Sequence, residues 1–105
     1  MTTYYFIAAS KRFLTEEEPL EEILKERRRN YKENNKNIDF WLLIKPIFLK
    51  SSQFKDLDTK IPKPQAAVIS TDKKFITFLK LRCEFVAYGE FESPSNEISD
   101  PLTVE

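Results

Sequence analysis

The chain has 105 residues, of which 41% are hydrophobic and nine are phenylalanine, so it is long enough for one domain and apolar enough to fold. Its 17 basic and 17 acidic side chains cancel, which argues against a general binder of nucleic acids or anionic membranes, because such binders need a basic excess. There is no histidine, and Cys83 is the only cysteine. This composition excludes Ser-His and Cys-His catalysis, the usual zinc sites and an intrachain disulfide, and the lone cysteine fits a reducing compartment.

The first third of the chain is predicted to form a strand and then a helix. Residues 3–9 are β-branched and aromatic over a short run, which is typical of a strand. Thr15 and Glu18 have the spacing of a capping box, which predicts a helix that begins at Thr15. An additional short strand at residues 12–14 is an alternative. The apolar stripe of the helix, partly covered by an arginine stem, consists of Leu20, Ile23, Leu24, Arg27 and Tyr31.

The middle third is predicted to contain two strands with a short helix between them. Residues 38–45 alternate in a strand pattern that places Phe40 and Trp41 on opposite faces. Both faces carry large apolar side chains, which predicts a central strand that is covered on both sides. Residues 51–58 are expected to form the short helix, and residues 66–70 the third strand.

A long helix is predicted near the end of the chain. Thr71 or Asp72 is expected to cap it, and it should run to about Tyr88, with Gly89 at its stop. The order of the elements predicts an α+β fold with two layers, in which a small, mainly antiparallel sheet of three to four strands is packed by helices.

The domain organisation follows from the composition of the C-terminal end. Residues 1–92 are expected to form a single domain, and residues 93–105 are expected to be a polar, acidic and loosely docked tail. No segment has the roughly 20 apolar residues of a transmembrane helix. The opening residues MTTYYFIAAS lack the features of a targeting peptide and are expected to be mature structure.

The predicted long helix carries Arg82 inside its apolar side. At about 100° per residue, its apolar residues form two surfaces: Phe75, Ile76, Leu79, Cys83 and Val86 on one side, and Phe78, Leu81 and Phe85 on the other. One surface is expected to pack on the sheet, and the other to face a second element or a partner, with Arg82 at the seam. Arg82 is then either a structural residue, snorkelling to water or paired with Asp39, or an interface arginine among aromatic side chains.

Three other features have a structural and a functional interpretation. Phe40 either belongs to a strand buried on both faces or is presented with Asp39 to another protein. The charge runs Glu16–Glu18 and Arg27–Arg29 fit the dipole of a helix, and the alternative is a docking patch for a charged partner or an anionic membrane. Cys83 is predicted to be a small core residue. No metal-ligand set, cofactor motif or catalytic residue is predicted.

Several blocks of the chain together resemble one protein family. In order they read TTYYFIAAS, RFLTEEEPLEEILKERRR, NIDFW, VISTDKKFITFLKLR, GEFESPS and DPL, and they cover residues 2–102. The chain resembles the small accessory protein of the oxygen-dependent magnesium-protoporphyrin IX monomethyl ester cyclase, a family of oxygenic phototrophs and their plastids. Departures from the family pattern are expected at Phe78, Cys83 and Phe85.

The resemblance implies a role in chlorophyll biosynthesis without catalysis. The chain would bind the membrane-associated di-iron subunit, which carries out the reaction that forms protochlorophyllide, and would support its assembly, accumulation or activity. The resemblance assigns partner binding to Asp39, Phe40 and Arg82, and structural support to Ala9. It further implies a free monomer in the plastid stroma or a cyanobacterial-type cytoplasm, associated with thylakoid membranes through its partner.

Two other functions compete with this one. The chain could be a carrier of the tetrapyrrole or a direct participant in the cyclase reaction, since its aromatic residues offer a stacking surface. Binding of nucleic acids through Arg27–Arg29 is the third possibility, and the zero net charge argues against it.

Overall fold

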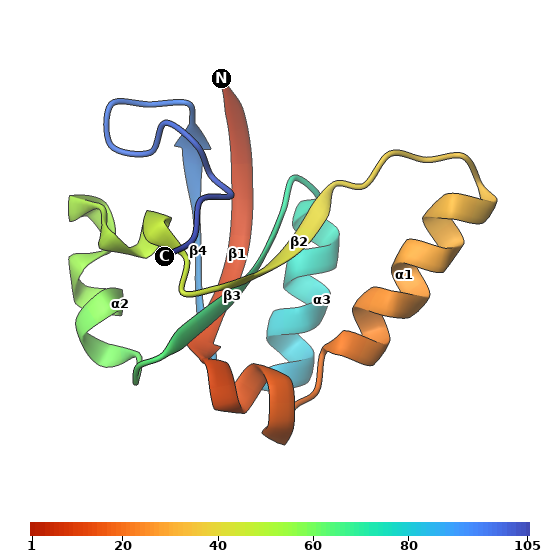
Figure 1. Cartoon of the computed structure of the whole chain (residues 1–105), viewed down its shortest axis with the longest axis horizontal. Coiled ribbons are helices and arrows are strands. Elements are labelled where there is room, and N and C mark those ends of the chain that lie inside the picture. Colours follow the sequence, from red (N-terminus) through yellow and green to blue (C-terminus); the bar gives the residue numbers. More distant parts are fainter.

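A single antiparallel sheet of four strands organises the chain (Figure 1). The computed structural model describes all 105 residues. The strands are β1 (Thr2–Ser10), β2 (Phe40–Ile44), β3 (Gln65–Ser70) and β4 (Ala87–Ser93), in the spatial order β2-β3-β1-β4. The predicted α+β fold with a small antiparallel sheet is therefore confirmed.

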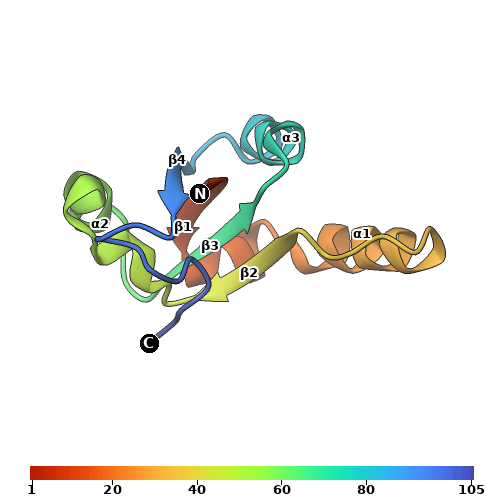
Figure 2. The same ribbon diagram turned by 90° about the horizontal axis from the view of Figure 1, so that it is seen from above.

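Two long helices and a short π-helix cover one face of the sheet. The helices are α1 (Glu21–Glu33) and α3 (Lys73–Cys83), and the π-helix is η1 (Phe13–Glu17). In Figure 2 both long helices lie on the same side of the strands. Helix α3 packs against the central strands β1 and β3.

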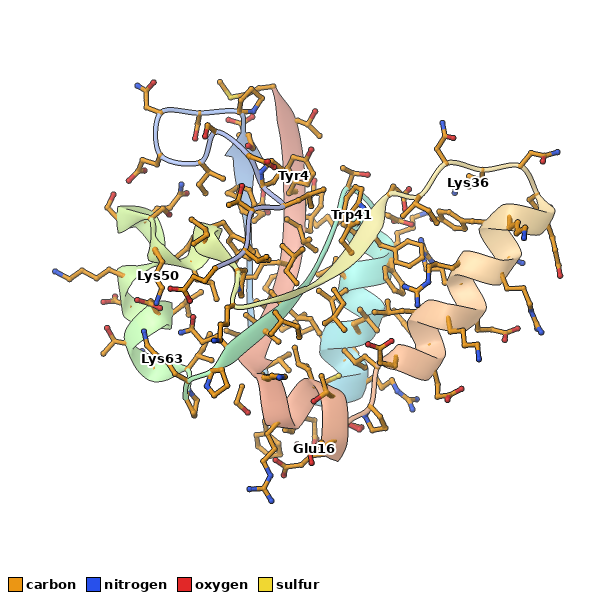
Figure 3. The ribbon with its side chains drawn as sticks, in the orientation of Figure 1. Tyr4, Glu16, Lys36, Trp41, Lys50 and Lys63 are labelled. Carbon is orange, nitrogen blue, oxygen red and sulfur yellow. The ribbon has the colours of Figure 1, made fainter.

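The opposite face is covered as well, by short helices and the C-terminal segment. These helices are η2 (Ile47–Lys50), η3 (Ser52–Phe54) and α2 (Lys55–Lys60). Lys50 and Lys63, which lie close together beside α2 in Figure 3, approach the Asp58 carboxylate at 3.3 and 3.5 Å. No helix in the chain is long and apolar enough to span a membrane.

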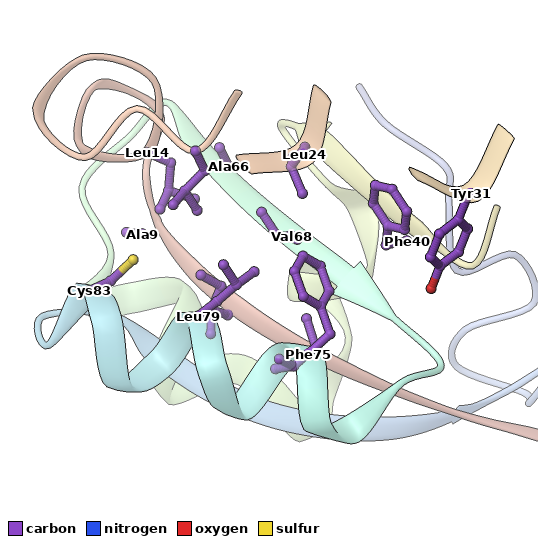
Figure 4. Packing of buried hydrophobic residues seen from close by; sticks show 13 residues of the cluster. Ala9, Leu14, Leu24, Tyr31, Phe40, Ala66, Val68, Phe75, Leu79 and Cys83 are labelled. Carbon is purple, nitrogen blue, oxygen red and sulfur yellow. The ribbon is translucent and has the colours of Figure 1, made fainter. Parts of the chain in front are cut away.

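The sheet separates two apolar clusters because successive side chains of a strand point to opposite faces. The cluster beneath α1 and α3 contains Phe40, Phe75 and Leu79 together with Ala9, which pairs with Ala66 across β1 and β3 (Figure 4). The cluster on the other face is built around the aromatic rings of Phe6, Phe48, Phe54 and Phe91. Phe40 and Trp41 pack into different clusters, as the alternation predicted.

The N-terminal helix prediction is wrong about its start. Thr15 makes no capping box: its hydroxyl donates to the Lys11 carbonyl at 2.7 Å within η1. Pro19 follows, and α1 begins only at Glu21, without a side-chain cap. The alternative strand at residues 12–14 is also wrong, because these residues enter the π-helix. A proline has no N–H to donate, so the two helical segments do not merge.

The strand at residues 38–45 is shorter than predicted and lies at the edge of the sheet. It forms β2, which pairs only with β3, and β3 and β1 are the central strands. Its two apolar faces are nonetheless both in contact with core clusters. The prediction of a central strand was wrong because an edge strand also packs on two faces when both sides of the sheet are covered.

The long helix ends five residues earlier than predicted. Asp72 caps α3, as expected, by accepting from the backbone N–H groups of Lys74 and Phe75. The helix stops at Cys83, where Glu84 takes a φ of 57° and Phe85 N donates to the Cys83 carbonyl at 2.6 Å. Gly89 is not a helix stop but lies in β4, a strand that was not predicted and whose first two residues were assigned to the helix.

The C-terminal segment is irregular and docked on the sheet. Ser93 Oγ donates to the Ile98 carbonyl at 2.6 Å, and the Ile98 side chain is buried. Val104 forms an isolated bridge with Pro46, and the Glu105 N–H donates to the Lys45 carbonyl at 3.0 Å. These contacts hold residues 94–105 beside β2 and η2.

Candidate functional site

A chain of polar contacts joins α1 to the start of α3 and to the residue before β2. Arg27 Nη2 donates to the Asp72 carboxylate at 2.9 Å and to the Tyr31 hydroxyl at 2.7 Å. That hydroxyl donates in turn to the Asp39 carboxylate at 2.9 Å. The series Asp72–Arg27–Tyr31–Asp39 thus alternates acceptors and donors across three elements, and such networks hold their members in one arrangement.

Aromatic rings surround the Arg27 guanidinium. Its central carbon lies 3.8 Å from the centre of the Phe75 ring, 5.0 Å from that of Tyr31 and 5.3 Å from that of Phe40. Arg27 Nε is buried and has no hydrogen-bond partner. The negative ring faces therefore provide much of the compensation for the desolvated cation, at about 0.5–2 kcal/mol per favourable pair.

A groove of ≈ 810 Å³ opens between α1 and α3 above this network. Ile23 and Arg27 line it from α1, and Lys74, Phe75 and Phe78 line it from α3. Three carboxylates, those of Glu22, Glu26 and Asp72, also reach it. Its floor is aromatic and its rim carries both signs of charge, a composition suited to an apolar protein segment with polar flanks.

Asp72 lines the groove, forms an ion pair with Arg27 and caps α3. Burial alone would raise the pKa of its carboxyl group. The backbone N–H groups of Phe75 and Lys74 and the Arg27 guanidinium oppose burial and hold this pKa below its ordinary value. The carboxylate is therefore ionised at neutral pH and both caps α3 and anchors Arg27.

The structure separates the three residues to which the family resemblance assigns partner binding. Asp39 is half-buried at the edge of the network, and Phe40 is 1% exposed beneath it, with its ring at 5.3 Å from Tyr31 (Figure 4). Arg82 is exposed and lies ten residues beyond Asp72, about 15 Å along the helix. The expected ion pair of Arg82 with Asp39 does not form, because Asp39 is held by Tyr31 at the other end of α3.

The two apolar surfaces predicted for α3 are present. Phe75, Ile76, Leu79 and Cys83 are buried against the sheet. On the other surface and just after the helix, Phe78, Leu81 and Phe85 are 52%, 74% and 81% exposed. Arg82 follows Phe78 by four residues and so lies next to it on the helix surface. Arg82 makes no ion pair within the chain and is free to contact another molecule.

Cys83 is buried, as predicted. Burial raises the pKa of its thiol, Glu18 adds to this effect, and Arg82 opposes it. A buried thiol with a raised pKa is a poor nucleophile at neutral pH. No group of three or more potential ligands is arranged to hold a metal ion.

Sequence reasoning missed the roles of Arg27, Tyr31 and Asp72. The signal was present, because Arg27 and Tyr31 lie four residues apart within the apolar stripe of α1, where a charged side chain needs a partner. Its partner Asp72 is distant in sequence, so only the fold brings the two together.

Comparison with known proteins identifies the family. The family model for the Ycf54 protein matches residues 2–93. The chain belongs to the Ycf54 family. A Ycf54-like protein of the cyanobacterium Synechocystis is 54% identical over 102 residues, which span 97% of this chain and 77% of that protein. A chloroplastic Ycf54 protein of Arabidopsis thaliana is 40% identical over 99% of this chain and 50% of its own length.

Solved structures of similar proteins have the same fold. The Ycf54 protein of Synechocystis sp. PCC6803 superposes with a TM-score of 0.93 at 52% identity, over 99% of this chain and 97% of that one. A protein of Nostoc sp. PCC 7120 superposes with a TM-score of 0.95 at 54% identity, over 98% and 95% of the two chains. Ycf54 relatives thus occur in cyanobacteria and in a chloroplast, which fits a plastid or a cyanobacterial cytoplasm for this chain.

Proposed function

We propose that the chain is a non-catalytic accessory subunit of chlorophyll biosynthesis that binds the di-iron magnesium-protoporphyrin IX monomethyl ester cyclase. It would support the assembly, accumulation or activity of that enzyme during protochlorophyllide formation. Membership of the Ycf54 family supports the proposal, as does the occurrence of relatives in oxygenic phototrophs. The observation that carries it is an unpaired, exposed Arg82 beside exposed Phe78, at the border of an aromatic groove.

In this proposal the three assigned residues act in two ways. Arg82 contacts the catalytic subunit directly, because arginines beside aromatic side chains are frequent hot spots of protein interfaces. Phe40 is buried and acts from beneath, by supporting the rings of Tyr31 and Phe75. Asp39 acts through its hydrogen bond to Tyr31 and through its half-buried position at the rim.

The test compares two arginines that are both exposed. Arg82→Ala should weaken capture of the catalytic subunit from pigment-making cells by roughly 30-fold or more, the range of a hot-spot residue. Arg28→Ala on the outer face of α1 is the matched control and should leave capture unchanged. Both variants should melt like the wild type, because exposed substitutions usually change stability by less than about 0.5 kcal/mol. Equal capture by both variants would refute the proposed role of Arg82.

A carrier of the tetrapyrrole substrate is the second candidate, favoured by the volume and aromatic floor of the groove. Three carboxylates at the groove disfavour a ligand that carries propionate groups. Titration of the purified chain with the porphyrin, followed by its Soret band, distinguishes the two functions. Tight binding at one molecule per chain, lost in Phe78→Ala, would favour the carrier.

The proposal also sets the location of the protein. The free chain would be a monomer in the plastid stroma or the cyanobacterial cytoplasm. Binding to the membrane-associated catalytic subunit would bring it to the thylakoid surface. Fractionation of cells with and without the catalytic subunit tests this dependence.

A further inference from the structure

A basic and apolar strip runs along the outside of α3 and is not explained by the groove. Leu81 and Phe85 are the most exposed of the large apolar side chains that follow Met1, at 74% and 81%, and neither lines the groove between α1 and α3. Phe78 lies one helical turn before Leu81, and Phe85 follows the turn at Glu84 that ends the helix. Together the three side chains expose on the order of 400 Å² of apolar surface, within the range of the largest apolar patch on a typical soluble monomer.

Every charged residue within α3 is basic. Lys73, Lys74, Lys80 and Arg82 are all exposed, and the helix contains no acidic residue. The whole chain has zero net charge, which argued against a general membrane binder, whereas the charged residues within α3 are all basic. Salt screens charges over about 10 Å, so the charges of the helix surface itself dominate any contact made there.

The bases lie on both sides of the apolar strip. Lys73 Nζ lies 5.9 Å from the centre of the Tyr5 ring and Lys80 Nζ lies 4.5 Å from that of Tyr88, so both lysines point toward β1 and β4. On the other side Lys74 lines the groove, and Arg82 lies between the strip and the buried face of the helix. Acids are near as well. Asp72 lies directly before the helix and Glu84 directly after it, Glu90 lies on β4, and Glu22 and Glu26 line the groove together with Lys74.

We propose that the outer face of α3 binds an anionic lipid surface. Leu81 and Phe85 insert between the lipid headgroups, and the flanking lysine and arginine side chains contact the anionic headgroups. Apolar and aromatic side chains between basic flanks are the usual composition of helices that lie in a membrane interface. A stable protein interface takes about 800 Å² from each partner, roughly twice what this strip offers. A membrane needs no matching shape, and the two side chains that would enter it are 74% and 81% exposed.

The lipid-binding strip and the cyclase-binding groove would then work side by side. The membrane would contact the outer face of α3. The groove between α1 and α3 and the Arg82 side chain would remain accessible to the catalytic subunit. The lipid binding itself does not depend on the proposed function, because it is a property of the isolated chain.

The experiment is co-sedimentation of the purified full chain with vesicles of phosphatidylglycerol and phosphatidylcholine, against vesicles of phosphatidylcholine alone. Binding should occur only with the anionic lipid and should fall as salt is added. Leu81→Ser and Phe85→Ser should each lower partitioning about tenfold, and Lys80→Gln about fivefold. The matched controls Val104→Ser, at a side chain that is 44% exposed, and Lys55→Gln on α2 should bind like the wild type.

Depth of insertion has its own measurement. The chain contains one tryptophan, Trp41, which packs against the cluster on the far face of the sheet. A Phe85→Trp substitution adds a reporter whose emission should move to shorter wavelength with anionic vesicles, while an Ile47→Trp reporter should not respond. Melting curves of every variant confirm that the exposed substitutions leave the fold intact.

Two outcomes would overturn the proposal: the wild type does not bind anionic vesicles at low salt, or the Leu81→Ser, Phe85→Ser double variant binds them equally well. If that variant keeps lipid binding but loses capture of the catalytic subunit in detergent, or abolishes a dimer of the free chain, the strip belongs to a protein contact. Loss of capture in Arg82→Ala alone concerns the proposed function and leaves the lipid proposal standing.

Discussion

Phe40→Ala is the substitution that best distinguishes a buried support from a contact residue. The Phe40 ring is 1% exposed and makes edge-to-face contacts with Tyr31 at 5.3 Å and Phe75 at 5.6 Å. Truncation of a buried phenylalanine costs about 3–5 kcal/mol, and it also removes one of the rings near the Arg27 guanidinium. A domain of this size has a free energy of unfolding of roughly 5–15 kcal/mol.

The expected loss is therefore a large fraction of the total stability. At about 4 °C per kcal/mol for a domain of this length, the midpoint of thermal unfolding should fall by about 12–20 °C. Circular dichroism melts and urea unfolding measure this change. Phe40→Leu, which keeps most of the apolar volume, should lose about 1.5 kcal/mol or less and should still capture the catalytic subunit.

A small effect would refute this reasoning. If Phe40→Ala melts within a few degrees of the wild type, Phe40 is not part of the core in solution. The proposal that it supports the rings of Tyr31 and Phe75 is then wrong. If Phe40→Leu folds stably yet fails to capture the catalytic subunit, the ring itself contacts the partner, and the strand must open to present it.

Three further predictions concern the fold around the site. Gly89→Ala should lower the free energy of unfolding by about 1–3 kcal/mol in urea titrations, because the added Cβ would lie 2.9 Å from the packed Phe6 ring. Asp72→Asn should keep the helix cap but make the free energy of unfolding less dependent on pH in the acid range. Since the pKa of Asp72 is lowered in the folded state, its contribution is present above its unfolded pKa and disappears as pH falls through the folded pKa, so variant and wild type should differ most near neutral pH. Glu84→Gly should raise the unfolding free energy by about 1 kcal/mol, because Glu84 has a φ of 57° that glycine adopts without strain; an unchanged or lower melting midpoint would contradict this.

The elements that were predicted well are those whose signal is local. Short runs of strand-forming residues identified β1 and β3, alternation identified the Phe40–Ile44 strand, and the capping residues Thr71 or Asp72 identified the start of α3. The end of α3 was missed because the helical apolar pattern continues through Val86, while the turn at Glu84 carries no glycine. The edge position of β2 was missed because it depends on which strand pairs with β3, and no local pattern encodes strand order.

Of the candidate site, the two surfaces of α3 were predicted and the polar network that joins α3 to α1 was not. The apolar arc of α3 was wide enough to require two surfaces, and the structure has both. The ion pair with Asp39, one of the alternatives for Arg82, does not form, because charge complementarity alone ignores distance along a helix. The start of α3 lies beside Asp39, where the Thr71 N–H donates to the Asp39 carbonyl at 3.1 Å, and ten residues of helix separate Arg82 from that point.

The two ends of α3, one beside Asp39 and the other at Arg82, differ in the contacts they make within the chain. The end at Asp72 is rigid, because Arg27 and Tyr31 join it to α1 and to the residue before β2. The other end carries Arg82 without any ion pair, and nothing in the chain restrains its guanidinium. The linked end fixes the angle of α3 against α1 and hence the width of the groove, whereas the exposed, unpaired cation of Arg82 is available to another molecule. Substitutions at Asp39 and Phe40 should therefore alter the shape of the docking surface, and Arg82→Ala should remove a contact from a surface whose shape is unchanged.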